Sequence, residues 1–208
     1  SNKKVLPKFH PATNIFVKNE HCFGCHSRSS RISTNYEGWQ ETLLEQEDIK
    51  GKKGFKTFED KRIYAQKEED VHHAKGLLCI DCHSSHEVMG DGKKYTHEEQ
   101  AVKLQCSDCH FKEKPKTIPY SKLDAESLLV FLHRDYKHTD KQIIAVEKDN
   151  HPLVNTYVET TGKAYLIGKG DNKLHELKPQ SEICSRDNAH KNVSCSTCHS
   201  SWTSRCIG

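Results

Sequence analysis

Four short motifs in this chain place two cysteines three positions apart, with a histidine directly after the second cysteine. They span Cys22–His26, Cys79–His83, Cys106–His110 and Cys195–His199. This spacing is the attachment signature of c-type haem, in which both thiols bond to one macrocycle and the histidine lies under its iron. A zinc site would require paired Cys-x-x-Cys units or a distant pair of histidines, and would not explain a histidine at the same place in all four motifs.

The motifs therefore predict four covalently attached haem c groups. The predicted attachment cysteines are Cys22, Cys25, Cys79, Cys82, Cys106, Cys109, Cys195 and Cys198. The predicted proximal iron ligands are His26, His83, His110 and His199. A chain with four haems is expected to carry electrons.

Each iron also takes a second axial ligand unless that position stays open. The chain has 15 histidines, of which eleven remain after the four proximal ones, and it has one methionine, Met89. This surplus favours bis-histidine ligation, which gives low-spin haems of low reduction potential. The histidines ranked first as distal ligands are His21, His72, His97 and His190. The reserve set, in which a surface position is the simpler interpretation of any one member, comprises His10, His73, His86, His138, His151 and His175.

Position along the chain supports part of this ranking. His72 and His73 lie just ahead of motif two, and one of them is expected to be a ligand while the other is a surface residue. His21 directly precedes Cys22, so it is too close to reach the distal face of its own haem. It would have to serve a neighbouring haem, and a distal ligand missing within one chain could come from another subunit.

Two cysteines, Cys184 and Cys206, lie outside the motifs. One interpretation is a structural disulfide that brackets the fourth haem, as an oxidising compartment would allow. The other is that Arg205-Cys206-Ile207-Gly208 begins a fifth haem motif that continues beyond this sequence. The two interpretations stand side by side.

The composition is unusual for a chain of 208 residues, since only 34% are hydrophobic and the mean hydropathy is −0.84. A domain of this size normally buries a larger apolar core. Four haems would replace that core, so we expect a mostly irregular, haem-cored chain with a few short α-helices and a small antiparallel β meander. The expected regions are a three-haem region at 1–140, the meander at 141–178 and a fourth-haem segment at 179–208.

Local patterns predict individual elements. Apolar spacing and capping signals predict helices over 39–48, 57–73, 96–105 and 124–134. Runs rich in β-branched and aromatic residues predict strands over 142–146, 153–159 and 163–167. The meander has two interpretations, a wall over a haem or a subunit contact through an exposed strand edge.

The formal net charge is +3. Each oxidised haem with ionised propionates would add about −1, so the basic balance is no sign of nucleic-acid binding. No stretch reaches the length of a membrane-spanning helix. Haem is attached covalently after export, so a removed signal peptide and a periplasmic or extracellular location are expected.

The residues around the motifs resemble a family of multihaem c-type cytochromes from metal-reducing and syntrophic microbes. The resemblance lies in Arg28–Ile32 after the first motif, in Cys79–Gly92, in His97–His110, and in Asn192–Trp202 preceded by His190. It covers most of the chain except the β segment. It implies that His72, His97 and His190 are ligands and that electrons move at or outside the cell envelope.

The leading functional hypothesis is an electron conduit without enzyme activity, because the chain has no phosphate loop or nucleophile elbow. Its expected partners are other multihaem cytochromes or copies of itself, which includes a filament subunit. The alternative is the electron-input domain of a multihaem oxidoreductase with one open haem.

Overall fold

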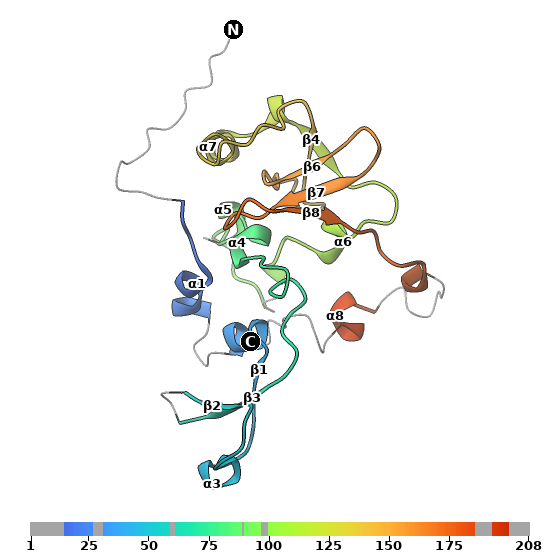
Figure 1. Cartoon of the computed structure of the whole chain (residues 1–208). Helices are drawn as coiled ribbons and strands as arrows, with labels where there is room; N and C mark the ends of the chain where they lie inside the picture. The colour runs from blue at the N-terminus through green and yellow to red at the C-terminus, as the bar shows by residue number, and fades with distance from the viewer. Residues whose placement is uncertain are drawn as a thin grey trace. The chain divides into compact units, whose positions relative to one another are not determined.

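The computed structural model describes residues 15–26, 31–58, 61–88, 90–96, 100–185 and 193–199 (Figure 1). The chain forms two compact units. The larger unit comprises residues 1–18 and 78–192, and the smaller unit comprises residues 19–77 and 193–208. Each unit contains one antiparallel sheet.

The sheet of the larger unit has five strands in the order β4-β5-β6-β7-β8. They span Thr117–Pro119, Gln142–Ile144, Thr156–Val158, Ala164–Ile167 and Leu174–Leu177. Tyr157 lies opposite Tyr165 with the rings stacked 5.3 Å apart, a pairing that fixes the β6–β7 register. Gly162, with φ +87°, supplies the left-handed position in the turn between these strands.

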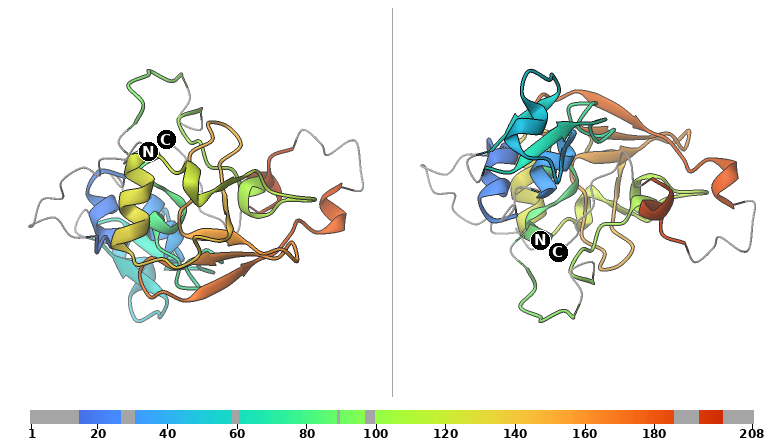
Figure 2. Two further views of the ribbon diagram at one scale, coloured as in Figure 1. Left: turned by 90° about the horizontal axis from the view of Figure 1, so that it is seen from above. Right: turned by 90° about the horizontal axis from the view of Figure 1, so that it is seen from below.

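Helix α7 (Ala125–His133) lies beside this sheet (Figures 1 and 2). It begins at Asp124, whose carboxylate accepts the Ser127 backbone N–H at 2.9 Å and the Ser127 hydroxyl at 2.7 Å. Phe131 is 1% exposed and packs with Leu123 and Ile143. The helix is therefore anchored to β5 by apolar burial. The 3₁₀ turn η2 (Tyr120–Lys122) precedes it.

A second apolar cluster of the larger unit consists of Ile144, Val146, Leu153 and Ala164, each at most 3% exposed. The partly buried Cys109 and Leu177 pack against it. The sheet is thus held by aliphatic and aromatic side chains of the protein itself.

The smaller unit has a three-stranded sheet in the order β1-β3-β2. The strands span Trp39–Glu41 (β1), Phe55–Thr57 (β2) and Ile63–Gln66 (β3), with helices α2 (Arg31–Tyr36) and α3 (Gln46–Ile49) beside them in sequence. Tyr64 is fully buried, and Phe58 meets it edge-on with ring centroids 4.6 Å apart.

The expected fold class, a mostly irregular haem-cored chain with a small meander, is wrong. The described residues form two antiparallel sheets, of three and five strands, with short helices, and the fold is β-rich. The physical reason is that the apolar residues are concentrated locally, so that the segment from Ile118 to Ile167 supplies two cores although the chain average is low. The division into regions 1–140, 141–178 and 179–208 stays a prediction.

Two of the expected helices are also wrong. Residues 39–48 form β1 and then α3, and residues 57–73 contain β3 and a turn over 71–76. In the expected 96–105 helix, residues 102–105 are non-helical, and 97–99 lie outside the described residues. Among the described residues no helix has the length and apolar character needed to cross a membrane.

Candidate haem-attachment sites

Three of the four motifs form one helical turn that starts at the first cysteine and ends at the second. These turns are α4 (Cys79–Cys82), α6 (Cys106–Cys109) and α8 (Cys195–Cys198). In each, the following histidine N–H donates to the carbonyl of the first cysteine, at 2.9, 2.8 and 3.0 Å respectively. Residues three apart lie on one helix face, so each turn presents its two thiols together.

Motif one occupies the end of a longer helix, α1 (Asn19–His26). The side chains of Cys25 and His26 lie outside the described part of the structure. Cys22 is partly buried and His21 beside it is exposed.

In motifs two and three, the residue before the second cysteine is an aspartate that caps the helical turn. Asp81 accepts the Leu78 backbone N–H at 2.6 Å, and Asp108 accepts the Gln105 N–H at 2.7 Å, so each caps its own turn. Both aspartates are buried, at 1% and 6% exposure.

The same two carboxylates join the motifs to the sheet. Asp81 also accepts the backbone N–H of Lys169 at 2.5 Å, and Asp108 accepts that of Glu147 at 3.0 Å. Lys169 lies just after β7 and Glu147 just after β5. Motifs two and three are therefore held in place by backbone N–H groups that follow two strands of the larger unit.

The predicted proximal histidine of motif two is oriented by a carboxylate. His83 Nδ1 lies 2.8 Å from Glu87 Oε2, at the end of helix α5 (Ser85–Val88). Burial raises the pKa of Glu87, but hydrogen bonds from His83 and from the amides of Leu104 and Lys103 outweigh burial and lower the pKa to about 2. The carboxylate is thus ionised and accepts the Nδ1 proton, which leaves the lone pair on Nε2, the nitrogen an iron would take.

The predicted proximal histidine of motif three is oriented by a backbone carbonyl. His110 Nδ1 lies 2.8 Å from the carbonyl oxygen of Lys178, directly after β8. A carbonyl only accepts hydrogen bonds, so Nδ1 carries the proton and Nε2 carries the lone pair. His199 of motif four is partly buried.

Motifs two and three are electrostatic neighbours. Burial raises the pKa of the Cys109 thiol, and the nearby Cys82 raises it further. Cys82 and Cys109 are therefore near enough to interact electrostatically.

The predicted distal ligands lie partly outside the described residues. His10, His97 and His190, like Met89 and Cys206, lie outside the described residues. His72 and His73 occupy the turn over 71–76 of the smaller unit. Their roles, and that of His21, stay predictions.

The geometry separates His72 from His73. His72 Nδ1 lies 3.0 Å from Oδ1 of the buried Asp70, which also accepts the His72 backbone N–H at 2.7 Å. His73 Nδ1 pairs with Glu69, and its ring meets Tyr36 edge-on at 5.0 Å. His73 thus packs on an aromatic ring and His72 is held by a buried carboxylate, and which of the two is a ligand stays a prediction.

Two reserve histidines of the larger unit have structural partners at Nε2. His86 Nε2 lies 3.0 Å from the Ser127 hydroxyl, and His138 Nε2 donates to the Val154 carbonyl at 3.1 Å. By contrast, Nε2 of His151 and of His175 is buried without a hydrogen-bond partner. His175 lies on β8 opposite Leu166.

Cys184 is exposed in the 3₁₀ turn η3 (Glu182–Ser185). Because Cys206 lies outside the described residues, the disulfide between them stays a prediction. Among the described residues no three His, Cys, Asp or Glu side chains gather as a metal-ion site.

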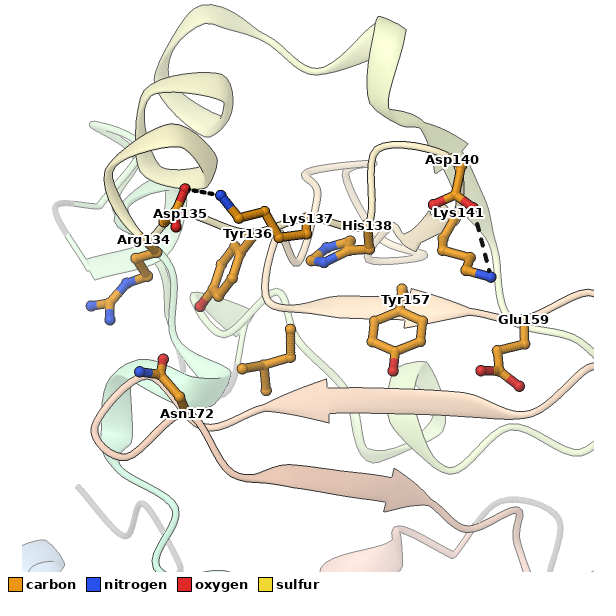
Figure 3. A pocket seen from close by; sticks show the side chains of 11 residues that line it. Arg134, Asp135, Tyr136, Lys137, His138, Asp140, Lys141, Tyr157, Glu159 and Asn172 are labelled. Atoms are coloured by element: carbon orange, nitrogen blue, oxygen red, sulfur yellow. Dashed lines mark hydrogen bonds and ion pairs between the residues drawn. The ribbon is translucent and has the colours of Figure 1, made fainter.

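The larger unit also has an open pocket of about 580 Å³ (Figure 3). Arg134–His138, Tyr157 and Asn172 contribute to its lining. Burial lowers the pKa of His138, against the opposing effect of its bond to Val154, and its ring meets Phe131 edge-on with centroids 4.8 Å apart. Motif cysteines do not contribute to this lining, so the pocket is separate from the attachment sites.

No family model, no curated protein and no solved structure matches this chain.

Proposed function

We propose that this protein is a tetrahaem c-type cytochrome that conducts electrons through bis-histidine, low-potential haems. The observation that carries the proposal is the repeated motif geometry. In α4, α6 and α8, two cysteines share one helical turn, and the next histidine closes that turn through its backbone N–H. The residues present fit a covalently bound haem at each turn.

The orientation of the proximal histidines supports the same function. His83 and His110 both use Nδ1 in hydrogen bonds, to Glu87 and to the Lys178 carbonyl, so in both rings Nε2 is the nitrogen with the lone pair. Such partners fix the tautomer and raise the basicity of a metal-bound imidazole.

When bound, the haems supply the one-electron redox chemistry.

The protein residues tether, orient and tune the haems. The capping carboxylates of Asp81 and Asp108 hold two motifs against the sheet, so the distance between their haems would be fixed. Glu87 places a negative charge next to motif two, whereas motif three has a neutral carbonyl in the same role. A carboxylate partner favours oxidised iron, so we expect the lower potential at motif two.

Haem content tests the proposal directly. The full chain should be exported from a host that attaches haem c and analysed by pyridine haemochrome assay and intact mass. We expect four covalent haems, and three in a Cys79→Ala/Cys82→Ala variant. Replacing the exposed Cys184 by Ala is the matched control and should leave four. Purified protein without covalent haem would overturn the proposal.

The proposal includes an exported, periplasmic or extracellular protein without enzyme activity, with other multihaem cytochromes or copies of itself as partners.

Carbon monoxide tests the alternative of an oxidoreductase input domain, because an open haem binds it after reduction and a bis-histidine haem resists it. Negative-stain electron microscopy separates filaments of this chain from discrete particles. Strand β8, at one edge of the five-stranded sheet, is the element we would examine first at an interface between copies.

A further inference from the structure

His151 combines burial with an unused ring nitrogen. Its side chain is 5% exposed and its Nδ1 lies 2.6 Å from Asp149 Oδ1. The same carboxylate oxygen accepts the His151 backbone N–H at 3.2 Å. Nδ1 therefore carries the proton and Nε2 carries the lone pair. That Nε2 is buried without a hydrogen-bond partner, which is rare for a polar atom and asks for an explanation.

The neighbouring histidine cannot supply the same function. The rings of His86 and His151 stack with centroids 5.5 Å apart at 24°. The His86 Nε2 is already engaged by the Ser127 hydroxyl at 3.0 Å, with Asp124 Oδ2 at 3.6 Å. His86 thus packs against one face of the His151 ring and is itself held in place by helix α7.

The loop that carries His151 lies beside both haem motifs of the larger unit. The Glu147 N–H donates to Asp108 of motif three, and Lys148 Nζ donates to the carbonyls of Gln100 and Val102, at 3.1 and 2.9 Å, ahead of that motif. His86, which stacks on His151, belongs to α5 directly after motif two. A nitrogen ligand on this loop would therefore be near the two attachment turns.

We propose that His151 is a distal axial ligand of the haem on motif two or motif three, with Asp149 as the residue that fixes its tautomer. The proposal rests on the proposed function, because it requires a haem in the larger unit. His151 was among the histidines for which a surface position was the simpler interpretation. Its burial and its oriented Nδ1 favour a ligand instead.

The first experiment compares the spin state of the full-length holoprotein with that of two variants. In His151→Ala we expect one haem of four to become high-spin in the oxidised electron paramagnetic resonance and optical spectra. The same haem should bind carbon monoxide after reduction. The matched control is His133→Ala, an exposed histidine on α7 of the same unit, which should keep the wild-type spectra. Four low-spin haems in His151→Ala would overturn the inference.

A second variant guards against misfolding of the first. His151→Met offers a thioether at the same place, so one haem should show a methionine–iron charge-transfer band and a raised potential. A purely structural histidine would give neither signal, and their absence in a protein with four haems would count against ligation.

The two failures are distinguishable. Wild-type protein without covalent haem would refute the proposed function, whereas four haems with unchanged spectra in both variants would refute the role of His151 alone. Asp149→Asn tests the positioning residue. We expect its haem to stay low-spin with a higher potential, because a neutral amide replaces the carboxylate, and unchanged potentials would remove Asp149 from that role.

Double variants identify which motif carries the haem that His151 ligates. His151→Ala is combined with Cys79→Ala/Cys82→Ala or with Cys106→Ala/Cys109→Ala, each of which removes one haem. The high-spin signal should disappear in only one combination, and that combination identifies the haem. A signal that persists in both would place the ligated haem elsewhere and overturn the inference.

Discussion

We expect the Glu87 carboxylate to tune the reduction potential of the haem proposed at motif two. Its Oε2 holds His83 Nδ1 at 2.8 Å, and its Oε1 accepts the Leu104 N–H at 3.0 Å and also the Lys103 N–H. The side chain is 6% exposed, so solvent screens its charge little. In Glu87→Gln the amide oxygen can keep the two backbone bonds, which leaves the NH₂ group facing the Nδ1 proton of His83.

The size of the effect can be worked from this geometry. A hydrogen bond to an ionised group contributes about 1.5–3 kcal/mol, against about 0.5–1.5 kcal/mol between neutral groups. Loss of the charge-assisted bond should therefore weaken the preference for oxidised iron by about 1 kcal/mol. For a one-electron couple, about 1.4 kcal/mol corresponds to about 59 mV, so the motif-two potential should rise by about 40 mV.

Spectroelectrochemical titration of the holoprotein measures this shift, with four one-electron components fitted together. Glu147→Gln is the control, because Glu147 is a carboxylate of the same unit with a side chain 74% exposed. We expect one raised component in Glu87→Gln and four unchanged components in the control. A Glu87→Gln protein with four low-spin haems and four unaltered potentials would refute the reasoning.

Three further predictions concern the fold and the motifs. Phe131→Ala should lower the free energy of unfolding by about 3–5 kcal/mol, since the side chain is 1% exposed, and urea titration would show a smaller loss if the core were unimportant. Asp108→Ala removes the acceptor of two backbone N–H groups, and should lower thermal stability more than Asp140→Ala at an exposed site. Burial lowers the pKa of Lys169 from 10.5 to about 8. At pH values between these two, the unfolded chain binds this proton more tightly than the folded chain, so the free energy of unfolding should rise with pH. Lys169→Met should reduce this rise in denaturation experiments, and an unchanged slope would contradict the assignment.

Elements with local signals could be predicted from the sequence. The helix expected over 124–134 corresponds to α7, because the Asp124 cap and the apolar spacing lie within a few residues of each other. The β-branched runs expected over 142–146, 153–159 and 163–167 overlap β5, β6 and β7. Strand β1 was missed because its partner is β3, with Trp39 opposite Gln66, and local periodicity carries no information about such distant pairing.

The candidate site divides in the same way. The motif cysteines and histidines could be predicted from the sequence. The contact between His83 and Glu87 also has a local signal, because the two residues are separated by one helical turn. An aspartate two residues before a histidine, as in Asp70-x-His72 and Asp149-x-His151, was a signal that sequence reasoning passed over. The Lys178 carbonyl that orients His110 could not be predicted, because only the folded sheet brings the two together.

The packing of Cys109 bears on how the protein matures. Its side chain lies against a cluster formed by Ile144, Ala164 and their neighbours, with Leu177 beside them, all of which follow Cys109 in the chain. The proposed function requires export, and in the N-to-C direction motif three would emerge before the strands that cover it. We expect haem to be attached there before the sheet closes, so a variant that weakens the sheet, such as Ile144→Asp, should acquire this haem at least as fast as wild type in a pulse-labelling experiment. Slower acquisition would show that attachment requires the closed sheet. With the opposite result, the Cys109 thiol stays accessible until its haem is bound, because the strands that cover it lie later in the chain.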